Sequence, residues 1–533
     1  MKKNNTFRRA AALVAALSIT VSLAAPAFAG TYYIDDGDIT IIKNENGSQT
    51  IKQQGKEDCT DQVGDETIIT THKKAITSLE SDLEGPAAED SGFGPVVEDN
   101  YQPAAPAQPK DAEEPKDADQ PESAEEPKSV DQPENTDRQE DADQQEDAEE
   151  PESAEEPEDA DRKESADRQA QPQQAAPADA APAAPAPANG FCKNIITVIN
   201  NAATALKLTL KDVKIDVSDT GKNTGYPWTS DEGKAALSVQ GKGSVEIELD
   251  GNNELKSGPH RAGLEKNTST STGTLTLKDD NNEAGSLTAT GGDWGAGIGN
   301  GGYYGNSDNR SGENITITGG TVNATGGWGG AGIGGGYYGS GKNITIKGGT
   351  VTATGGEEGA GIGGGYYYGG GYYGNGYYGN GENIKITDGT VNATGGWGGA
   401  GIGGGGGGNG AGGNGKNITI IGGTVTAGGG YRGAGIGGGI SGSGKNITIT
   451  GGTVNADGGD NGAGIGGGAT GSGSNVTVSG AAQVTATAGK SNGYYGAGAT
   501  IGNGGNYTNG ENVDGEEIQA NISGLITGWI HHI

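Results

Sequence analysis

A glycine-rich motif is the first stretch of this 533-residue chain whose residue types could do chemistry. GAGIGG at residues 330–335 has the spacing G-x-G-x-x-G, in which glycines let the backbone approach the pyrophosphate of a dinucleotide. Such a site also needs a helix whose N-terminus faces the phosphates, and no helical pattern follows. The same string recurs in successive repeats. We therefore interpret it as structural and expect no cofactor.

Residues suited to acid-base catalysis or metal binding are scattered. The four histidines are His72, His260, His531 and His532. The carboxylates of one stretch, Asp212, Asp216, Glu246, Glu248 and Asp250, alternate along expected strands, which is typical of a solvated face. Solenoid enzymes that cleave polysaccharides need clustered carboxylates with a basic residue, and calcium-binding solenoids need a regular Asp column. We therefore expect no catalytic residues, no metal site and no enzyme.

Aromatic residues at one corner of the repeat are the strongest candidates for binding. The two positions after each TGG string, or after the equivalent GGG string at 428–430, vary, and they include Trp294, Trp328, Trp397 and Tyr431. GYYG strings add further rings, with Tyr337 and Tyr338 among them. Flat rings at regular spacing could stack on the sugar faces of a polysaccharide or contact a partner protein. The alternative is that these rings fold over and shield glycine-rich corners from water.

Two cysteines, Cys59 and Cys192, flank a long acidic segment. In an exported protein an isolated pair is a candidate disulfide, which would tie together the strands before and after that segment. The alternative is two free thiols, because spacing alone proves no bond. No C-x-x-C and no paired histidine accompanies them, so zinc is not supported.

A repeat of 29 residues organises the second half of the chain. Its first asparagine recurs at Asn314, Asn343, Asn383, Asn417, Asn446 and Asn475. Two of the steps are longer, and their extra residues fall between Gly365 and Gly381 and between Gly403 and Gly415, which indicates a loop at one corner. Arrays of this period bury a core only by stacking their units.

Each unit contains three short stretches with alternating apolar residues. Ile315 and Ile317 face one way, Val322 and Ala324 follow in the second stretch, and Ile333 lies in the third. Glycine strings between them permit tight corners. The pattern predicts an all-β fold, a right-handed parallel β-solenoid (β-helix) of about 29-residue coils, with aliphatic residues inside and Thr and Asn outside. The asparagines, which formally match glycosylation sequons at Asn314, Asn343, Asn417 and Asn446 among others, are expected to form a stacked column.

The N-terminal residues 1–29 predict a secretory signal peptide, with basic residues, an apolar run and an A-x-A cleavage site. Residues 30–84 read as strands that open or cap the solenoid, and 85–189 as a disordered acidic linker rich in Pro, Ala and Glu. Residues 190–290 predict N-terminal coils, 291–505 the glycine-rich repeats and 506–533 a C-terminal cap or tail. No later stretch could span a bilayer.

Composition limits the function classes. With 107 glycines and only 31% hydrophobic residues, a large conventional core is out of reach. The glycines do not fall at every third position, which excludes collagen. A formal net charge of −34 argues against a nucleic-acid partner, because phosphate backbones need clustered Lys and Arg.

The strand-like runs carry a family resemblance. LSVQGKGSVEIELDGNNELKSG at 237–258, LTLKDDNNEAGSLTATGG at 275–292 and the GAGIGGG and NITITGGTV units resemble secreted surface proteins of Gram-positive bacteria. Those proteins carry a glycine-rich β-solenoid that is often labelled carbohydrate-binding. The resemblance covers 30–84 and 190–505, and it implies an adhesin-like or glycan-contacting role with no defined ligand residues.

Together these observations predict a secreted or cell-surface binding scaffold that contacts extracellular glycans or a host or cell-wall surface through its aromatic corners. The second reading is a purely structural extracellular spacer or matrix protein whose loops bind nothing specific. A polysaccharide-active enzyme is the third reading, and it lacks its residues.

Overall fold

The structure, a computed structural model, describes residues 29–61, 67–72, 190–222, 231–281, 283–302, 311–368, 379–408 and 412–533. All of them belong to one folded unit. The expected signal peptide at 1–29, apart from Ala29, and the expected acidic linker at 85–189 lie outside the described residues. Among the described residues, no helix has the length and apolar character needed to cross a bilayer.

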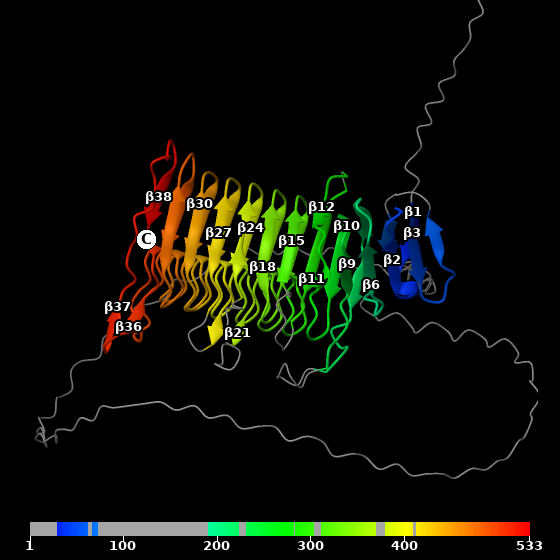
Figure 1. The fold of residues 1–533 in the computed structure, drawn as a ribbon, viewed down its shortest axis with the longest axis horizontal. Coiled ribbons are helices and arrows are strands. Elements are labelled where there is room, and N and C mark those ends of the chain that lie inside the picture. The colour runs from blue at the N-terminus through cyan, green and yellow to red at the C-terminus, as the bar shows by residue number, and fades with distance from the viewer. Residues whose placement is uncertain are drawn as a thin grey trace, which may run out of the picture. The chain divides into compact units, whose positions relative to one another are not determined.

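The described chain is a parallel β-solenoid whose coils stack as successive rungs, as the sequence pattern predicts (Figure 1). Each rung contributes one strand to each of three walls. Within the repeats, strands of neighbouring rungs pair in parallel without a register shift, so that Ile315 lies beside Ile344 and Val322 beside Val351. This register places identical residues of the repeat in continuous columns.

The first wall carries the NITI stretch of each repeat, and its strands pair along the stack. They are β1 (Ala29–Tyr33), β5 (Thr67–Thr70), β7 (Leu206–Lys211), the first half of β10 (Val245–Lys256), β12 (Leu275–Lys278), β15 (Ser311–Ile317), β18 (Ser340–Ile346), β22 (Gly381–Glu382) with β23 (Lys385–Ile386), β27 (Gly415–Ile420), β30 (Gly444–Ile449) and β33 (Gly473–Val478).

The second wall carries the TVNAT stretch, and β10 runs continuously from the first wall into it. Its other strands are β8 (Lys214–Asp216), β13 (Gly285–Thr290), β16 (Thr321–Thr325), β19 (Thr350–Thr354), β24 (Thr390–Thr394), β28 (Thr424–Gly428), β31 (Thr453–Asp457), β34 (Gln483–Thr487) and β38 (Trp529–His532).

The third wall carries the GAGIGG stretch, with two-residue strands in the repeats and longer ones before them. It consists of β2 (Ile39–Lys43), β3 (Gln49–Gln53), β4 (Cys59–Asp61), β6 (Ile196–Asn200), β9 (Leu237–Gly241), β11 (Leu264–Ser271), β14 (Ile298–Gly299), β17 (Ile333–Gly334), β20 (Ile362–Gly363), β25 (Ile402–Gly403), β29 (Ile436–Gly437), β32 (Ile465–Gly466) and β35 (Ile501–Gly502). The remaining elements are the 3-10 turn η1 (Ile34–Asp36) and two short pairs, β21 (Tyr367–Tyr368) with β26 (Gly407–Gly408) and β36 (Asn506–Thr508) with β37 (Glu511–Val513).

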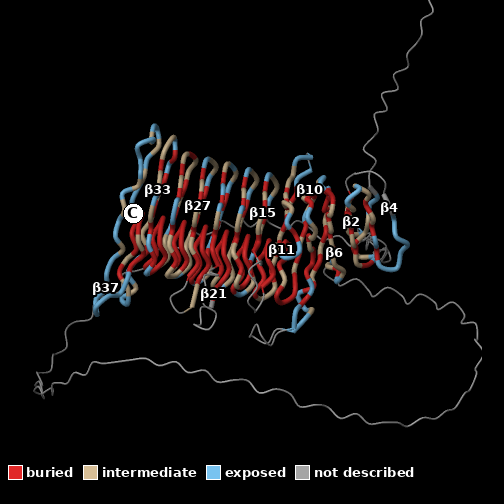
Figure 2. The backbone as a smooth tube through the Cα atoms, in the orientation of Figure 1, coloured by how far each residue is buried: buried red, intermediate tan, exposed pale blue. Residues whose placement is uncertain are grey.

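The core is a thin column of aliphatic side chains along the axis of the stack. Buried residues recur from rung to rung along the backbone (Figure 2). Ile315, Ile317, Val322 and Ile333 of one repeat are each fully buried, and so are their equivalents in the rungs on either side. The inward assignment made from the alternation is therefore confirmed. Outward residues of the same strands, such as Thr321, face solvent.

Glycine at the third wall lets neighbouring rungs approach closely. A Cβ added to Gly330 would lie 2.0 Å from the carbonyl oxygen of Gly295 in the preceding rung. Gly334 has φ +132, and a Cβ there would lie 2.1 Å from the carbonyl oxygen of Gly363 in the next rung. Any side chain at these positions would push the rungs apart, which explains the invariant GAGIGG string within the chain.

The repeated asparagines form a hydrogen-bonded ladder, as the sequence predicts. Each side-chain amide donates from Nδ2 to the Oδ1 atom of the asparagine one rung earlier, with distances of 3.0 Å (Asn343 to Asn314), 3.1 Å (Asn383 to Asn343), 3.1 Å (Asn417 to Asn383), 3.0 Å (Asn446 to Asn417) and 2.7 Å (Asn475 to Asn446). All six have positive φ between 53 and 57°, a left-handed conformation that asparagine tolerates better than most residues. The ladder is exposed and runs along the start of the first wall.

The first end of the solenoid is closed by antiparallel strands. β2 pairs in parallel with β6 on one side and antiparallel with β3 on the other, and β3 pairs with β4. In the first wall, β1 pairs with β5, and β5 pairs with β7. Strands from before residue 73 therefore lie beside strands from after residue 189, and both contribute to the same core.

Candidate functional site

The corner between the second and third walls carries the variable pair of positions after each TGG string. The loop that follows the third-wall strand of the next rung folds back onto this pair. Backbone hydrogen bonds fix the contact, from Tyr337 N–H to the carbonyl oxygen of Trp294 (2.7 Å) and from Tyr366 N–H to that of Gly329 (2.7 Å). We call this part of the surface the corner edge. Two groups of aromatic residues lie on it.

Aromatic cluster 1 consists of Trp294, Trp328, Tyr337, Tyr338 and Tyr366. Trp328 lies at its centre, with ring centroids 6.5 Å from Trp294, 5.9 Å from Tyr337 and 5.4 Å from Tyr366. The ring of Tyr338 meets Tyr337 edge-on at 4.5 Å. Contacts of this geometry are the favourable ones for aromatic pairs.

The structure corrects two of the six ring candidates. Trp294 is 2% exposed and Tyr337 is 4% exposed, so neither can present a face to a ligand. The reason is the back-folded loop, which places Tyr337 and Tyr366 over the corner of the preceding rungs. Trp294 also packs on His260, 4.6 Å between ring centroids, and burial lowers the pKa of His260. Here the rings shield a glycine-rich corner. Tyr338 is half-buried, and Trp328 keeps 37% of its surface exposed.

Glu358 occupies the corner position of the rung between Trp328 and Trp397. Its Oε2 atom is buried without a hydrogen-bond partner and lies against Gly398 and Gly406 of the next rung. Burial, together with the charge of Glu357, raises the pKa of Glu358 to about 7. Glu357 beside it is exposed. The carboxyl group separates the two aromatic clusters.

Aromatic cluster 2 consists of Trp397, Tyr431, Arg432 and Tyr495. Trp397 and Tyr431 come from adjacent rungs and stack with centroids 5.5 Å apart and an interplanar angle of 26°. Both remain well exposed, Trp397 at 46% and Tyr431 at 38%. The guanidinium group of Arg432 lies over three rings, 5.6 Å from Trp397, 5.4 Å from Tyr431 and 4.8 Å from Tyr495. Asn492 donates a hydrogen bond to the Tyr431 hydroxyl (3.0 Å), which holds that ring in place.

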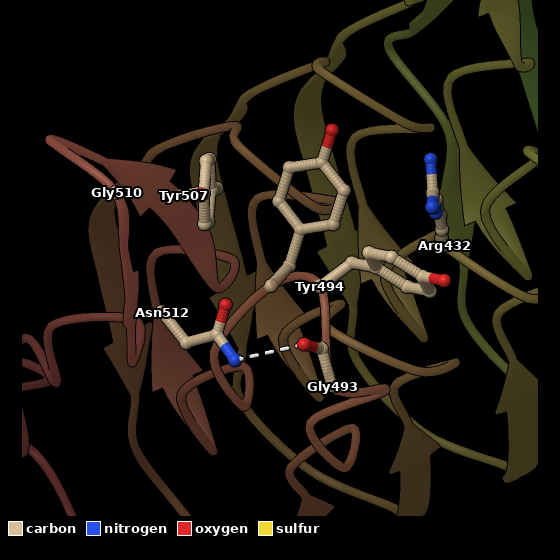
Figure 3. A pocket seen from close by; sticks show the side chains of 7 residues that line it. Arg432, Gly493, Tyr494, Tyr507, Gly510 and Asn512 are labelled. Atoms are coloured by element: carbon tan, nitrogen blue, oxygen red, sulfur yellow. Dashed lines mark hydrogen bonds between the residues drawn. The ribbon is translucent and has the colours of Figure 1, made fainter. Parts of the chain in front are cut away.

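An open hollow of about 670 Å³ continues aromatic cluster 2 toward the last rungs (Figure 3). We call it the tyrosine hollow; it is lined by Arg432, Gly493, Tyr494, Tyr495, Tyr507, Gly510 and Asn512. Asn512 Nδ2 donates to the Gly493 carbonyl oxygen (3.1 Å), which links the β36–β37 hairpin to the loop that carries Tyr494. Tyr494 is 75% exposed and Tyr507 is 53% exposed. Rings, a guanidinium group and an amide thus converge on one accessible space.

The polar groups of this region suit the recognition of hydroxyl groups. Arg432 forms no ion pair within the described part of the chain, so its N–H groups are not committed to a carboxylate. The hydroxyls of Tyr494 and Tyr507 and the amide of Asn512 can both donate and accept hydrogen bonds. Exposed ring faces beside such groups offer an apolar platform with a polar border.

The two cysteines are free thiols in the structure, so the candidate disulfide is not formed. Cys59 is exposed on β4 at the closed first end of the third wall. Cys192 is buried, and its backbone forms an isolated parallel β-bridge with Ile215 of β8 in the second wall. The disulfide is not formed because the two cysteines lie on different walls. Burial raises the pKa of the Cys192 thiol to about 11.

Two of the five carboxylates expected on a solvated face are buried instead, whereas Asp212, Asp216 and Glu246 remain partly exposed. Glu248 is 1% exposed and pairs with Lys278 (3.0 Å), while Asp250 is 5% exposed and accepts a hydrogen bond from Asn281 (2.7 Å). Burial raises the pKa of Glu248 despite the Lys278 charge. These groups are tied up in structural contacts between neighbouring rungs.

A polar group that the sequence does not reveal lies at the closed first end. Asp35, Asp36 and His72 come within metal-ligating distance of one another, from segments on both sides of residues 62–66. His72 Nε2 contacts Asp36 (2.9 Å), its ring stacks on Tyr33, and Lys56 pairs with Asp36 at 2.7 Å. The Lys56 ammonium already neutralises Asp36 and lowers its pKa, so the group is explained as an exposed ion-pair network.

Sequence reasoning identified the corner edge but not the residues that complete aromatic cluster 2. Arg432 lies at a variable corner position next to Tyr431, and this position in the repeat could have indicated it as a candidate binding residue. Tyr495, Tyr507 and Asn512 lie where the repeat has decayed, and only the stacking of rungs brings them beside Arg432. Trp397 and Tyr431 remain the exposed candidates that the structure brings together.

A family model described as a beta helix repeat matches the chain at residues 315–337, 344–366, 384–406, 418–440 and 447–469. Each match begins just after a ladder asparagine and ends in the loop that folds over the corner edge. Comparison with curated proteins and with solved structures found no match. The matched repeats and the stacked parallel walls together show that the chain is a β-helix repeat protein.

Proposed function

We propose that this protein is an exported binding scaffold that holds extracellular carbohydrate against aromatic cluster 2 and the tyrosine hollow. The observation that carries the proposal is the exposed Trp397–Tyr431 pair with the Arg432 guanidinium lying over both rings. Sugar rings have one apolar face and a border of hydroxyls, and this surface offers ring faces with hydrogen-bonding groups at their edge.

The proposal includes export, because the sequence at 1–29 has the pattern of a secretory signal peptide. The solenoid supports a binding role by its rigidity, since each rung is hydrogen-bonded to both neighbours and holds its corner residues in place. Preformed surfaces lose little entropy on binding. An extended polysaccharide lying along the stack would meet several rungs at once.

A purely structural spacer is the second candidate, and one observation favours it. Aromatic cluster 1 buries Trp294 and Tyr337, so part of the ring set serves to cover glycine-rich corners. Aromatic cluster 2 differs because Trp397, Tyr431 and Tyr494 remain exposed. If the spacer reading is right, neither cluster retains a ligand.

A glycan array with the full chain tests the proposal. The double variant Trp397→Ala with Tyr494→Ala should weaken binding of the retained glycans by about tenfold or more, because each lost ring contact contributes about 1 kcal/mol. Ile421→Ala, which trims an exposed apolar residue away from the corner edge, is the matched control and should bind as the parent does. Absence of glycan binding by the parent chain, or equal binding by the double variant, would refute the proposal.

A further inference from the structure

Within the described residues, the last rung of the solenoid is paired on one side only. β38 pairs in parallel with β34, and isolated bridges join Asn521 to Thr477 and Leu525 to Gly480. Among the described strands, β34 is the only one that pairs with β38. In a parallel ladder, successive residues direct their backbone groups to opposite neighbours. Because Trp529 and Ile533 donate toward the preceding rung, the N–H and C=O groups of Ile530 and His532 point to the uncovered side.

The uncovered side of the last rung is apolar. Ile518, Leu525 and Ile530 pack on the core while remaining partly exposed. An open hollow of about 770 Å³ exposes them, lined also by Thr500, Glu517, Gln519, Ala520, Ile522 and His532. Around it, Ile522 is 49% exposed, Ile526 83%, Trp529 43% and Ile533 59%. Figure 2 shows the last rung as an exposed band at the end of the stack. Exposed apolar surface at a strand edge is typical of an interaction surface.

The same rung carries almost no charge. Residues 518–533 contain no Lys, Arg, Asp or Glu, in a chain with a formal net charge of −34. Two copies of so acidic a protein repel each other, so a contact between copies is favoured where charges are fewest. The one carboxylate that lines the hollow, Glu517, already accepts hydrogen bonds from Thr500 and from the Ile501 backbone amide. A largely apolar face of this kind is complementary to another of the same kind.

The first end of the solenoid does not offer such a face. Its outer strands β3 and β4 are antiparallel, and ion pairs lie beside them, Lys52 with Asp58 (2.8 Å) and Lys56 with Asp36 (2.7 Å). Docking the last rung of one copy onto the first end of another would bury these charges against isoleucines, which is costly. A head-to-tail chain of copies is therefore disfavoured.

We propose that the last rung is a dimerisation surface that receives the last rung of a second copy of this chain, tail to tail about a two-fold axis. Two-fold contacts are the commonest closed assembly, because one self-complementary patch satisfies both partners. The second rung would cover Ile522, Ile526 and Trp529 and give the edge groups of Ile530 and His532 antiparallel partners. Each copy would then end against an apolar surface instead of water.

Sedimentation velocity of the full chain over a range of concentrations tests this proposal. The parent chain should dimerise, and Ile526→Glu should raise the dimer dissociation constant at least a hundredfold by placing a charge in the contact. Ile526 is 83% exposed, so the substitution leaves the core intact. Ile421→Glu puts the same charge on another exposed isoleucine, outside the last rung, and should leave the dimer unchanged.

A mixing experiment distinguishes the tail-to-tail arrangement from others. Across a two-fold axis the two copies of residue 526 lie near each other, so an equimolar mixture of Ile526→Glu and Ile526→Lys should form a heterodimer that neither variant forms alone. A monomeric parent chain, open-ended polymers, or a mixture that stays monomeric would each overturn the proposal. Loss of glycan binding without change in this assembly would affect only the function proposed above.

Discussion

At the scale of single residues, Glu358 shows how a stacked fold changes the chemistry of a side chain. The next rung covers its carboxyl group with glycine backbone, and burial raises its pKa from 4.5 to about 7. Between these values the folded chain binds more protons than the unfolded chain. The contribution of Glu358 to stability is therefore most favourable below pH 4.5, and it is lost as the pH rises through about 7.

The substitution Glu358→Gln tests this effect, because glutamine keeps the shape and cannot ionise. Above pH 7 the variant should be more stable than the parent chain. Its free energy of unfolding should be higher by about 1–2 kcal/mol, after allowance for partial solvent screening. At pH 4.5 and below, the two proteins should melt at nearly the same temperature. Thermal melts followed by circular dichroism at pH 4.5 and pH 8 measure the difference.

Glu357→Gln is the matched control at the neighbouring position. Its side chain is exposed, so its removal should change the pH dependence only through a small reduction of the Glu358 pKa. A Glu358→Gln variant with the same pH dependence as the parent chain would show that the carboxyl group is solvated in the folded protein.

At the scale of the repeated element, the asparagine ladder connects the rungs outside the core. Asn383 is an interior member, which donates to Asn343 and accepts from Asn417. Its φ of 56° is in the left-handed region, where asparagine and glycine are better tolerated than alanine. Two separate properties therefore favour asparagine at this position, its side-chain hydrogen bonds and its tolerance of a positive φ.

Two substitutions at Asn383 separate these properties. Asn383→Gly keeps the backbone conformation and removes two side-chain hydrogen bonds, so it should lower stability by about 1 kcal/mol. Asn383→Ala should cost about 1–2 kcal/mol more, because alanine is strained at positive φ. Urea midpoints measured for both variants give the two contributions.

The end of the ladder supplies the control. Asn475 donates to Asn446 and accepts no side-chain bond from a later rung within the described residues. Asn475→Gly should therefore cost about half as much as Asn383→Gly. Equal effects at the two positions would mean that the ladder bonds contribute nothing beyond local backbone preference.

At the scale of the whole molecule, stability comes from contacts between neighbouring rungs rather than from a central core. Because each rung contacts only its neighbours, unfolding of one rung removes stabilising contacts from the rungs on either side. Ile333 lies between Ile298 and Ile362 in a continuous buried column of the third wall. It is fully buried, so an ionised group there has no partner and no water.

Ile333→Asp should therefore unfold several rungs on both sides of the substitution. Far-UV circular dichroism should lose β signal, and hydrogen exchange should speed up in β14 to β20 before more distant strands. Thr321→Asp, an equal charge on the exposed face of β16, should leave both measurements unchanged. Native exchange protection in Ile333→Asp would contradict the inward column.

The architecture could be predicted from the sequence because equivalent positions of successive repeats stack in one column and therefore carry the same type of residue. Alternation placed Ile315, Val322 and Ile333 inside, and the recurring asparagine placed a ladder outside. Both depend on local pattern and on stacking in register. The same reasoning could not decide which rings are exposed, because Trp294 is covered by a loop that belongs to the next rung.

The remaining differences have the same origin. Glu248 and Asp250 were expected in solvent, but lysine and asparagine side chains from neighbouring segments cover them. Asp36 and His72 meet although they are 36 residues apart. Contacts between residues that the repeat does not relate have no periodic signal, so their positions require the three-dimensional structure.

The close approach at Gly330 and Gly334 has an evolutionary consequence. Substitutions at such glycines separate two layers at once, whereas the two variable corner positions already differ from rung to rung within one stack. A protein built in this way can lengthen by duplicating a whole 29-residue unit, and it can acquire a different surface chemistry by mutating only those two positions in each copy.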